Sequence, residues 1–394
     1  MKQARILYVE NPCGNTGETR GVYSHLLRFV SFRYNLPMFA PESSGLLPVV
    51  GETQLKVLLV KTSSLGDVFH TLPAVQDAFR QVPDIEFHWV VEEGFSEVPE
   101  WHPAVTRVIP VAWRRWRKSL KDPAVRAEMK AFYRSIRKEK YDLVLDAQGL
   151  IKSAVFTRLA RGTKAGLDRA SLREPLAALA YKRRIRVPKG QHAILRTRQL
   201  FARALNYRLP EQLAYGIDKS RWQRPDIEGE YWVFLHGTTW VTKLWPEAYW
   251  RSLAELGVAQ GKKVVLLWGN DEERERAERI VDGIEGAQVL PRMPLNEVSA
   301  WLAYAEGVVG VDSGLSHLAA AMETGMIAIF GSTDATLTGV LGPHCEIIKS
   351  DLECAPCRSK QCLLNEPGDI QPPCYREITP ERVKDQLLIQ ISEA

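Results

Sequence analysis

Short apolar runs alternate along this chain with longer stretches in which apolar residues recur at helical spacing. The strand-like runs are 55–61, 86–91, 107–111 and 143–147 in one half, and 232–236, 263–268, 288–290, 307–311 and 327–330 in the other. Helical patterns lie between them, at 123–138, at 192–206, from Pro246, near Asp271, near Leu295 and after Ser313. This alternation predicts parallel sheets covered by helices on both faces.

The chain is long enough for two such units. It has 394 residues, more than one ordinary hydrophobic core requires. A polar, proline-containing stretch at 210–230 is the best linker. We expect doubly wound, Rossmann-like domains at 55–218 and 225–378 that face a cleft, and a capped C-terminal helix at 379–394. Residues 1–54 show loop signals, one strand-like run (5–9) and a short helical pattern (22–32). We treat them as an N-terminal extension of unknown role.

Composition narrows the class of protein. Hydrophobic residues make up 45% and charged residues 25% of the chain, as in soluble globular proteins. No apolar run reaches the length of about 18 residues that suggests a membrane-spanning helix, and the apolar run near Met1 is too short for a signal-peptide core. We therefore expect a cytoplasmic protein.

The net charge of +5 is mild, but the basic residues are clustered. They are either solvated or form a surface for an anionic partner such as a phosphorylated lipid, a membrane or nucleic acid. Trp113 and Trp116 lie within the first cluster and favour a membrane-interface or sugar-binding edge there. The clusters are Arg114, Arg115, Arg117, Lys118 and Lys121, and Lys182, Arg183, Arg184 and Arg186.

Four cysteines lie close together near the C-terminus: Cys354, Cys357, Cys362 and Cys374. At this chain length they do not indicate a secreted disulfide scaffold. The CxxC pair could bind a metal, but no second CxxC or HxxxH completes a common zinc pattern. A metal site, a redox-sensitive pair and an ordinary loop all remain open.

Two glycine turns carry the candidate chemistry. Each follows a buried strand and precedes a helix start, where free N–H groups suit a phosphate or a carboxylate. Asp67 in the first turn would stay ionised and could take a proton from a hydroxyl nucleophile, or it could simply cap the helix. His317 in the second is either functional or a packed, hydrogen-bonded histidine. The turns are Lys61-Thr62-Ser63-Ser64-Leu65-Gly66-Asp67 and Asp312-Ser313-Gly314-Leu315-Ser316-His317.

Two further loops follow strands of the second half. Thr238, Thr239 and Lys243 are residue types that contact phosphate. Glu273 could accept hydrogen bonds from a ribose, or it could be a favourable acidic residue in the first turn of a helix. The sequence has no GxxxxGK[ST], no GxGxxG after a strand, no Asp-x-Asp, no GxSxG and no HExxH.

Together these residues resemble the lipopolysaccharide heptosyltransferase family. The first turn and His70-Thr71-Leu72-Pro73-Ala74 look like the family's opening, and the second turn and Phe330-Gly331-Ser332-Thr333-Asp334 match its donor half. The likeness runs from about Leu55 to Gly342 and through the C-terminal helix. Four stretches are similar to the heptosyltransferase I branch in particular: Trp89-Val90-Val91-Glu92-Glu93-Gly94-Phe95, Arg114-Arg115-Trp116-Arg117-Lys118, Asp146-Ala147-Gln148-Gly149-Leu150 and Arg173-Glu174-Pro175-Leu176.

The resemblance implies a GT-B fold and inverting transfer of L-glycero-D-manno-heptose from ADP-heptose, a co-substrate, to Kdo2-lipid A. It implies that the reaction needs no metal and no cofactor, and that nucleic acid is not a partner. It also implies a peripheral position on the cytoplasmic face of the inner membrane. Asp67 would be the general base and Lys243 would stabilise the leaving group. The donor would meet Thr238, Thr239, Lys243, Glu273 (ribose), Met293 (adenine), Asp312, Ser313, Gly314 and His317. The acceptor would meet Ser63, Ser64, Gly66, Arg114, Arg115, Lys118 and Arg173.

Two features depart from the family pattern. Residues 1–54 have no counterpart, and Cys354-Ala355-Pro356-Cys357 is similar to tails of heptosyltransferase II. Heptosyltransferase II, which uses a heptose acceptor, is therefore the alternative enzyme. A non-catalytic nucleotide-binding module with a basic surface is the alternative from another class.

Overall fold

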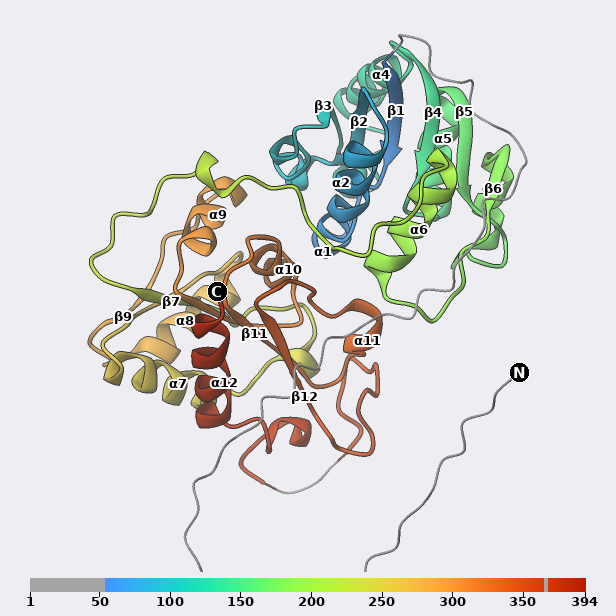
Figure 1. Ribbon diagram of the computed structural model, residues 1–394. Coiled ribbons are helices and arrows are strands. Elements are labelled where there is room, and N and C mark those ends of the chain that lie inside the picture. The colour runs from blue at the N-terminus through green and yellow to red at the C-terminus, as the bar shows by residue number, and fades with distance from the viewer. Residues whose placement is uncertain (1–53, 365–367) are drawn as a thin grey trace, which may run out of the picture. The chain divides into compact units, whose positions relative to one another are not determined.

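In the part of the chain that the structure describes, the strands form two separate parallel sheets of six strands each (Figure 1). The computed structural model describes residues 54–364 and 368–394. The first sheet has the order β3-β2-β1-β4-β5-β6 and the second β12-β11-β10-β7-β8-β9. Taken from β9, the second order repeats the first, and both are the strand order of a Rossmann fold. The predicted fold class, two doubly wound α/β halves, is confirmed.

Helices cover both faces of the first sheet. Val57 and Leu59 of β1 share a core with α2 and α6, whereas Leu58 and Val60 share another with α4 and α5. Apart from Lys56 near its start, the strand is apolar because both faces are buried. This half comprises β1 (Leu55–Val60), α1 (Leu65–Phe69), α2 (Leu72–Gln81), β2 (Ile85–Glu92), β3 (Val105–Val111), α3 (Trp113–Trp116), α4 (Pro123–Arg137), β4 (Lys140–Asp146), α5 (Ile151–Leu159), β5 (Arg161–Leu167), β6 (Arg183–Ile185) and α6 (Ala193–Leu205).

The second sheet is built in the same way. Trp232 and Phe234 of β7 pack with α7, α8 and α12, and Val233 and Leu235 pack with α9 and α10. This half comprises β7 (Tyr231–Leu235), α7 (Glu247–Ala259), β8 (Lys263–Leu266), α8 (Asp271–Val281), β9 (Ala287–Val289), α9 (Leu295–Ala303), β10 (Gly307–Val311), α10 (Gly314–Ala321), β11 (Met326–Phe330), α11 (Ala335–Thr338), β12 (Cys345–Lys349) and α12 (Pro380–Ser392).

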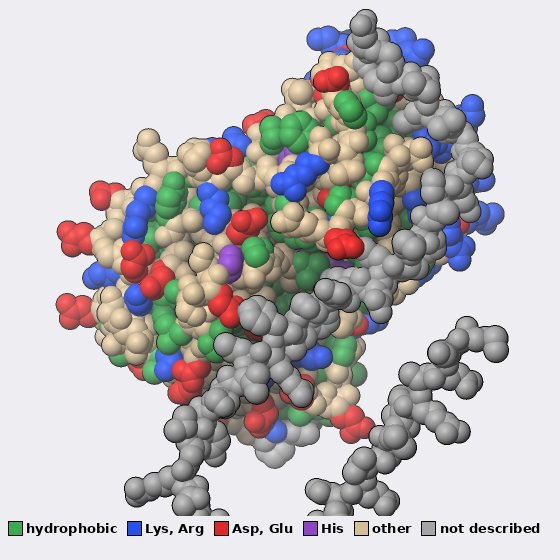
Figure 2. All heavy atoms as spheres, viewed as in Figure 1, with side chains coloured by type: hydrophobic (Ala, Val, Ile, Leu, Met, Phe, Trp, Pro, Cys, Tyr) green, Lys and Arg blue, Asp and Glu red, His purple; other side chains and the backbone are tan. Residues whose placement is uncertain are grey.

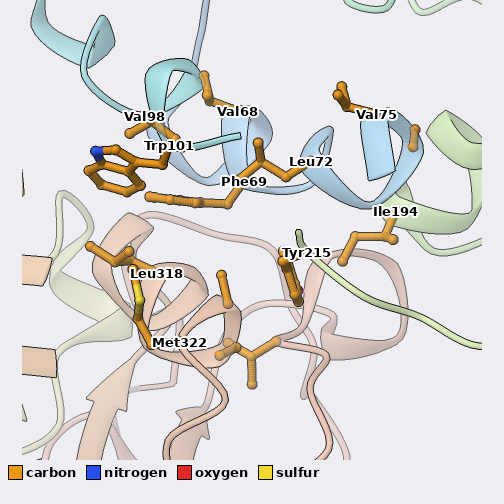
Figure 3. Packing of buried hydrophobic residues seen from close by; sticks show 14 of the residues in the cluster. Val68, Phe69, Leu72, Val75, Val98, Trp101, Ile194, Tyr215, Leu318 and Met322 are labelled. Carbon is orange, nitrogen blue, oxygen red and sulfur yellow. The ribbon is translucent and has the colours of Figure 1, made fainter. Parts of the chain in front are cut away.

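One apolar core joins the two halves. The described residues all fall within a single unit, and one buried cluster includes residues of both sheets. Figure 3 shows Phe69 and Leu72 facing Leu318 of α10 and Met322, the C-cap of that helix, with Tyr215 beside them. This packing holds the carboxyl end of β1 close to that of β10.

Three strands were not expected from the sequence. β5, β6 and β12 each carry charged residues and bury few side chains, and β6 and β12 are edge strands, so they lack the apolar run of a central strand. Pro246 is the N-cap of α7 and not its first residue. Thr379 caps α12 as expected, its hydroxyl accepting from Arg382 N at 3.4 Å.

Some expectations are not tested. The boundaries 55–218 and 225–378 stay a prediction, although each range contains one whole sheet. The strand at 5–9 and the helix at 22–32 lie outside the described residues. In the part of the chain that the structure describes, no helix combines the length and the apolar character that crossing a bilayer requires.

A buried ion pair fixes α6 against α2 near the segment that leads to the second sheet. Arg198 Nε lies 2.6 Å from Asp77 Oδ2, and the side chains are only 6% and 4% exposed. The same guanidinium donates to the carbonyls of Pro210 and Gln212 at 2.8 and 2.9 Å. Arg198 therefore holds three segments together.

We expect Arg198→Met to lower the free energy of unfolding by about 3–5 kcal/mol, because it leaves the Asp77 carboxylate buried without a partner. Urea denaturation followed by circular dichroism measures this loss. The control is Asp77→Leu/Arg198→Met, which should lose less than the single variant. A loss below about 1 kcal/mol for Arg198→Met would contradict the prediction.

Candidate active site

A cavity of about 590 Å³ lies between the carboxyl ends of the two sheets. Its walls come from the turn after β1 on one side and from the loops after β7, β8, β10 and β11 on the other. β1 and β7 are the strands next to which each sheet reverses its order, and ligands of open α/β sheets bind at that point. The volume is in the range of small-molecule sites.

Asp67 lies at the start of α1, where it lines the cavity. Its Oδ2 accepts hydrogen bonds from Ser64 N and from Ser64 Oγ, both at 2.8 Å. Its Oδ1 pairs with Lys61 Nζ at 3.2 Å. Ser64 is the N-cap and Asp67 the third helical residue, so the two form a capping box. The carboxylate thus supports the helix start and faces the cavity, two roles that are compatible.

The surroundings of Asp67 keep it ionised. Burial between the sheets raises its pKa, but the Lys61 ammonium and the two Ser64 donors outweigh burial and hold the pKa well below its usual range. The side chain is still 43% exposed. An ionised carboxylate with this access can receive a proton from a hydroxyl group in the cavity.

Ser63 supports the turn from behind. Its side chain is buried, and Ser63 does not line the cavity, whereas Ser64 and Gly66 do. Its Oγ accepts from Lys152 Nζ at 2.7 Å, and its carbonyl accepts from Gln148 Nε2 at 2.6 Å. The sequence analysis assigned no role to Lys152, because this residue of α5 belongs to no recognisable motif.

Asp312 organises the opposite wall. Lys243 Nζ lies 2.7 Å from its Oδ2, which also accepts from Thr333 Oγ1 at 2.6 Å. The Asp312 carbonyl accepts from Thr238 Oγ1 at 3.0 Å. Lys243 lies over the Trp240 ring at 4.8 Å from its centroid. These contacts hold an ammonium and a hydroxyl at the cavity, next to Thr239.

The N-terminus of α10 also faces the cavity. Ser313 is its N-cap and makes no capping hydrogen bond through its side chain. Ser316 Oγ donates to Val311 O at 2.6 Å and lies 3.3 Å from Ser313 Oγ. Since Ser313 and Gly314 line the cavity, the first N–H groups of this eight-residue helix are available to an anion.

The far end of the cavity combines an acid with an apolar surface. Glu273 Oε2 accepts from Gly269 N at 2.7 Å. Gly237 lets Glu273 approach, because a Cβ there would lie 2.6 Å from its Cδ. Met293 lines the cavity together with side chains that sequence reasoning missed: Trp268, Leu295 and Val298. The available signal was the pair of apolar residues in the first turn of α9, Leu295 and Val298, which follows Met293 and the N-cap Pro294.

Two glycines bring the helix starts of the two sheets together. A Cβ on Gly66 would lie 2.8 Å from His317 Cδ2, and one on Gly314 would lie 3.0 Å from Leu65 Cβ. Next to this contact, His70 Nε2 lies 3.2 Å from His317 Nδ1, so one imidazole donates to the other across the two halves. His317 is thus packed and hydrogen-bonded, and it also lines the cavity.

The basic acceptor candidates lie outside the cavity. Arg114, Arg115, Lys118 and Arg173 are exposed and do not line it. Arg115 pairs with Glu93 and Glu128 at 3.1 and 2.8 Å. The interpretation of Trp113 and Trp116 as an interface edge is wrong: Trp116 is 4% exposed within the core beneath α4 and α5, and the partly buried Trp113 packs against that core.

The four clustered cysteines line one small cavity beside Thr242 and Gly331. Cys345, Cys357, Cys362 and Cys374 are free thiols. Burial raises the pKa of the Cys374 thiol to about 12, so it is protonated and unreactive at neutral pH. Within residues 54–364 and 368–394, no group of three or more His, Cys, Asp or Glu side chains is arranged to hold a metal ion.

Comparison with known proteins gives a consistent result. The model of glycosyltransferase family 9 (heptosyltransferase) matches residues 129–367. Lipopolysaccharide heptosyltransferase 1 of Pseudomonas aeruginosa is 52% identical over 84% of this chain and 97% of its own. The solved Escherichia coli heptosyltransferase WaaC with ADP is 44% identical, with a TM-score of 0.76 over 85% of this chain and 100% of its own. The same protein with ADP-2-deoxy-2-fluoro heptose gives a TM-score of 0.74 over 85% and 99%.

The contact between His70 and His317 predicts acid sensitivity. Burial lowers the pKa of His317 to about 4 and that of His70 well below 6.5. In the unfolded chain both imidazoles return to the ordinary histidine pKa of about 6.5. As the pH falls from 6.5 towards 4, the unfolded state binds protons that the folded state excludes, so stability is lost over this interval. We expect the stability of His317→Gln to depend less on pH, by up to about 1.4 kcal/mol per pH unit. Urea titrations between pH 7 and 4.5 measure it, and parallel curves for both proteins would refute the prediction.

Proposed function

The chain belongs to glycosyltransferase family 9, the heptosyltransferases, and from this membership and the cavity we propose that it transfers L-glycero-D-manno-heptose from ADP-heptose to Kdo2-lipid A. The observation that carries the proposal is the pairing across one cavity of an ionised Asp67 with Lys243 and the α10 N-terminus. The relatives' names support a role in building the lipopolysaccharide core. Heptosyltransferase II remains the alternative enzyme.

The proposed reaction is a single displacement with inversion. The acceptor hydroxyl loses its proton to the Asp67 carboxylate while its oxygen bonds to the anomeric carbon of the heptose. The bond from that carbon to the diphosphate oxygen breaks, and its electron pair leaves with ADP. One negative charge disappears at Asp67 and one develops on the diphosphate, so a base and a set of cationic and N–H donors are needed on opposite walls.

The donor half of the cavity suits ADP-heptose. Lys243, Thr238, Thr239 and the α10 N-terminus at Ser313 and Gly314 would hold the diphosphate, with Asp312 and His317 beside them. Glu273 would accept from the ribose. Met293 would contact the adenine, and the nearby Leu295 and Val298 would extend its apolar surface. No metal ligand is assigned in this scheme, because Lys243 and backbone N–H groups would stabilise the leaving ADP.

The acceptor is proposed to enter over the first half of the molecule. Kdo carboxylates and lipid A phosphates are anionic, and Arg114, Arg115, Lys118 and Arg173 give this side positive charge. Ser64 and Gly66 would lie next to the attacking hydroxyl. Because lipid A is anchored in a bilayer, we place the enzyme at the cytoplasmic face of the inner membrane as a peripheral protein.

An acceptor assay tests the proposed function. With ADP-heptose we expect heptose transfer to Kdo2-lipid A and little or none to the mono-heptosylated lipid, since only the former lacks the first heptose. The rates should be unchanged in excess EDTA, because no metal takes part in the proposed leaving-group chemistry. Mass spectrometry of the lipid product measures the transfer. Preference for the mono-heptosylated acceptor would favour heptosyltransferase II, and loss of activity in EDTA would overturn metal independence.

Replacement of the proposed base gives a second test. Asp67→Asn should lower kcat by roughly 10²-fold or more while ADP affinity changes little, because the amide keeps the shape but cannot accept the proton. Steady-state kinetics and calorimetric titration with ADP measure the two effects. Asp385→Asn, an exposed carboxylate on α12, is the matched control and should behave like the wild type. Near-normal turnover of Asp67→Asn would support the non-catalytic nucleotide-binding module.

A further inference from the structure

Four large apolar side chains are exposed on two neighbouring helices of the first half. They belong to α5 and to the 3-10 helix η3 (Pro175–Ala180). Scattered exposed apolar residues are normal, but contiguous ones mark an interaction surface. We call this set the α5–η3 face; its members are Ile151, Val155, Leu176 and Leu179, which are 49%, 51%, 62% and 69% exposed.

The two helices pack through their other sides. Ala154 of α5 shares a small buried cluster with Ala177 and Ala178 of η3. Glu174 Oε2 accepts from the Ile151 backbone N at 2.7 Å, which ties the start of η3 to the start of α5. Because small alanines fill the contact, the larger residues at i, i+4 on α5 and at i, i+3 on η3 are left outward. This arrangement is a property of the fold and not of one flexible side chain.

The surroundings of this face are strongly basic. Between residues 151 and 189 the chain has eleven Lys and Arg against two Asp and Glu, a net charge of +9 where the whole protein has +5. Arg158, Arg173, Lys182 and Arg184 from this segment are exposed, and Arg184 Nε donates to Ala178 O of η3 at 3.1 Å. Figure 2 shows blue side chains gathered along the β5–β6 edge of the first sheet. Apolar side chains rimmed by cations fit an anionic bilayer.

The face is continuous with the base side of the cavity. Lys152 follows Ile151 on α5, and its Nζ donates to Ser63 Oγ at 2.7 Å, four residues before Asp67. Burial lowers the pKa of Lys152, and the negative charges of Glu92 and Asp67 oppose this shift. One turn of α5 therefore connects the exposed apolar side chains to the wall that would hold the acceptor.

We propose that the α5–η3 face docks on the headgroup region of an anionic bilayer, with Leu176, Leu179, Ile151 and Val155 inserted and the surrounding Lys and Arg against lipid phosphates. The inference rests on the proposed function, because a membrane-anchored acceptor is what makes such a surface useful. It assigns the membrane contact to this face and not to Trp116, which is buried, or Trp113, which is partly buried and packs against the same core.

Vesicle binding by the full chain tests this assignment. We expect wild-type protein to sediment with vesicles of 70% phosphatidylcholine and 30% phosphatidylglycerol, and binding to weaken with added salt. Leu176→Ser/Leu179→Ser should lower the partition coefficient at least about tenfold, since two apolar side chains no longer insert. Arg158→Gln/Lys182→Gln should lower it on anionic vesicles only. The control is Leu363→Ser, an 85% exposed leucine far along the chain, which should bind like the wild type.

Activity gives a second readout. With vesicle-embedded acceptor, Leu176→Ser/Leu179→Ser should raise KM, whereas its turnover on a deacylated, water-soluble acceptor should equal that of the wild type. A vesicle affinity within about twofold of the wild type would overturn the proposal. So would light scattering that shows a wild-type dimer made monomeric by the leucine variant with vesicle binding unchanged, because the face would then join two copies.

The vesicle experiment contains neither ADP-heptose nor acceptor, so its result is independent of the proposed reaction. Vesicle binding that needs these leucines, found in a protein that transfers no heptose, would leave the docking surface standing and remove the function. Heptose transfer by a protein whose vesicle binding does not depend on Leu176 and Leu179 would support the proposed function and overturn the docking surface.

Discussion

The arrangement depends on the close approach of two helix starts, α1 from the first sheet and α10 from the second. Gly66 leaves room for the His317 ring, and Gly314 leaves room for Leu65. A methyl group at either position would lie 3.0 Å or less from its neighbour. Because protein interiors are densely packed, such an overlap would push the two helix starts apart. Through this contact Asp67, Lys243 and the N–H groups of α10 line one cavity and not two separate surfaces.

The repeated strand order explains why both helix starts carry chemistry. In each sheet the strand order reverses between two neighbouring strands, β1 and β4 in the first sheet and β7 and β10 in the second. Loops there are free of the helices that cover the rest of the sheet, so a ligand can reach backbone N–H groups. The same architecture, used twice, offers a carboxylate from one half and, from the other, the ammonium and helix N-terminus that we propose to bind phosphate.

Central strands and their turns were predictable from the sequence. β1 and β10 are apolar at nearly every position and are followed by glycine turns, so local pattern and tertiary role agree. β5, β6 and β12 were missed because edge or partly exposed strands need no continuous apolar run. The partners of Asp67 show the same limit: Ser64 is local, whereas the support of its turn by Lys152 joins positions 89 residues apart, which a single sequence does not reveal.

Trp116 and Leu176 show why a sequence does not tell which side chains of a short helix are buried and which are exposed. A tryptophan beside arginines resembles an interface residue, yet Trp116 donates to Glu128 Oε2 at 2.7 Å from within the core. Leu176 resembles a core residue, yet it is exposed because the alanines of η3 take the inward positions. Which side of a short helix turns inward depends on the partner helix, and that information is not local.

The ion pair between Lys243 and Asp312 bears on how the cavity behaves between turnovers. With Asp312 at 2.7 Å, the ammonium already has a counter-charge before any phosphate enters. In the proposed reaction, an incoming diphosphate would have to share this cation with Asp312 or displace the carboxylate, so it would replace one electrostatic contact by another and gain only the difference. On this proposal the exchange would limit the affinity for nucleotide. When the product ADP leaves, Asp312 would again pair with Lys243, so no unpaired ammonium would remain in the partly buried cavity wall.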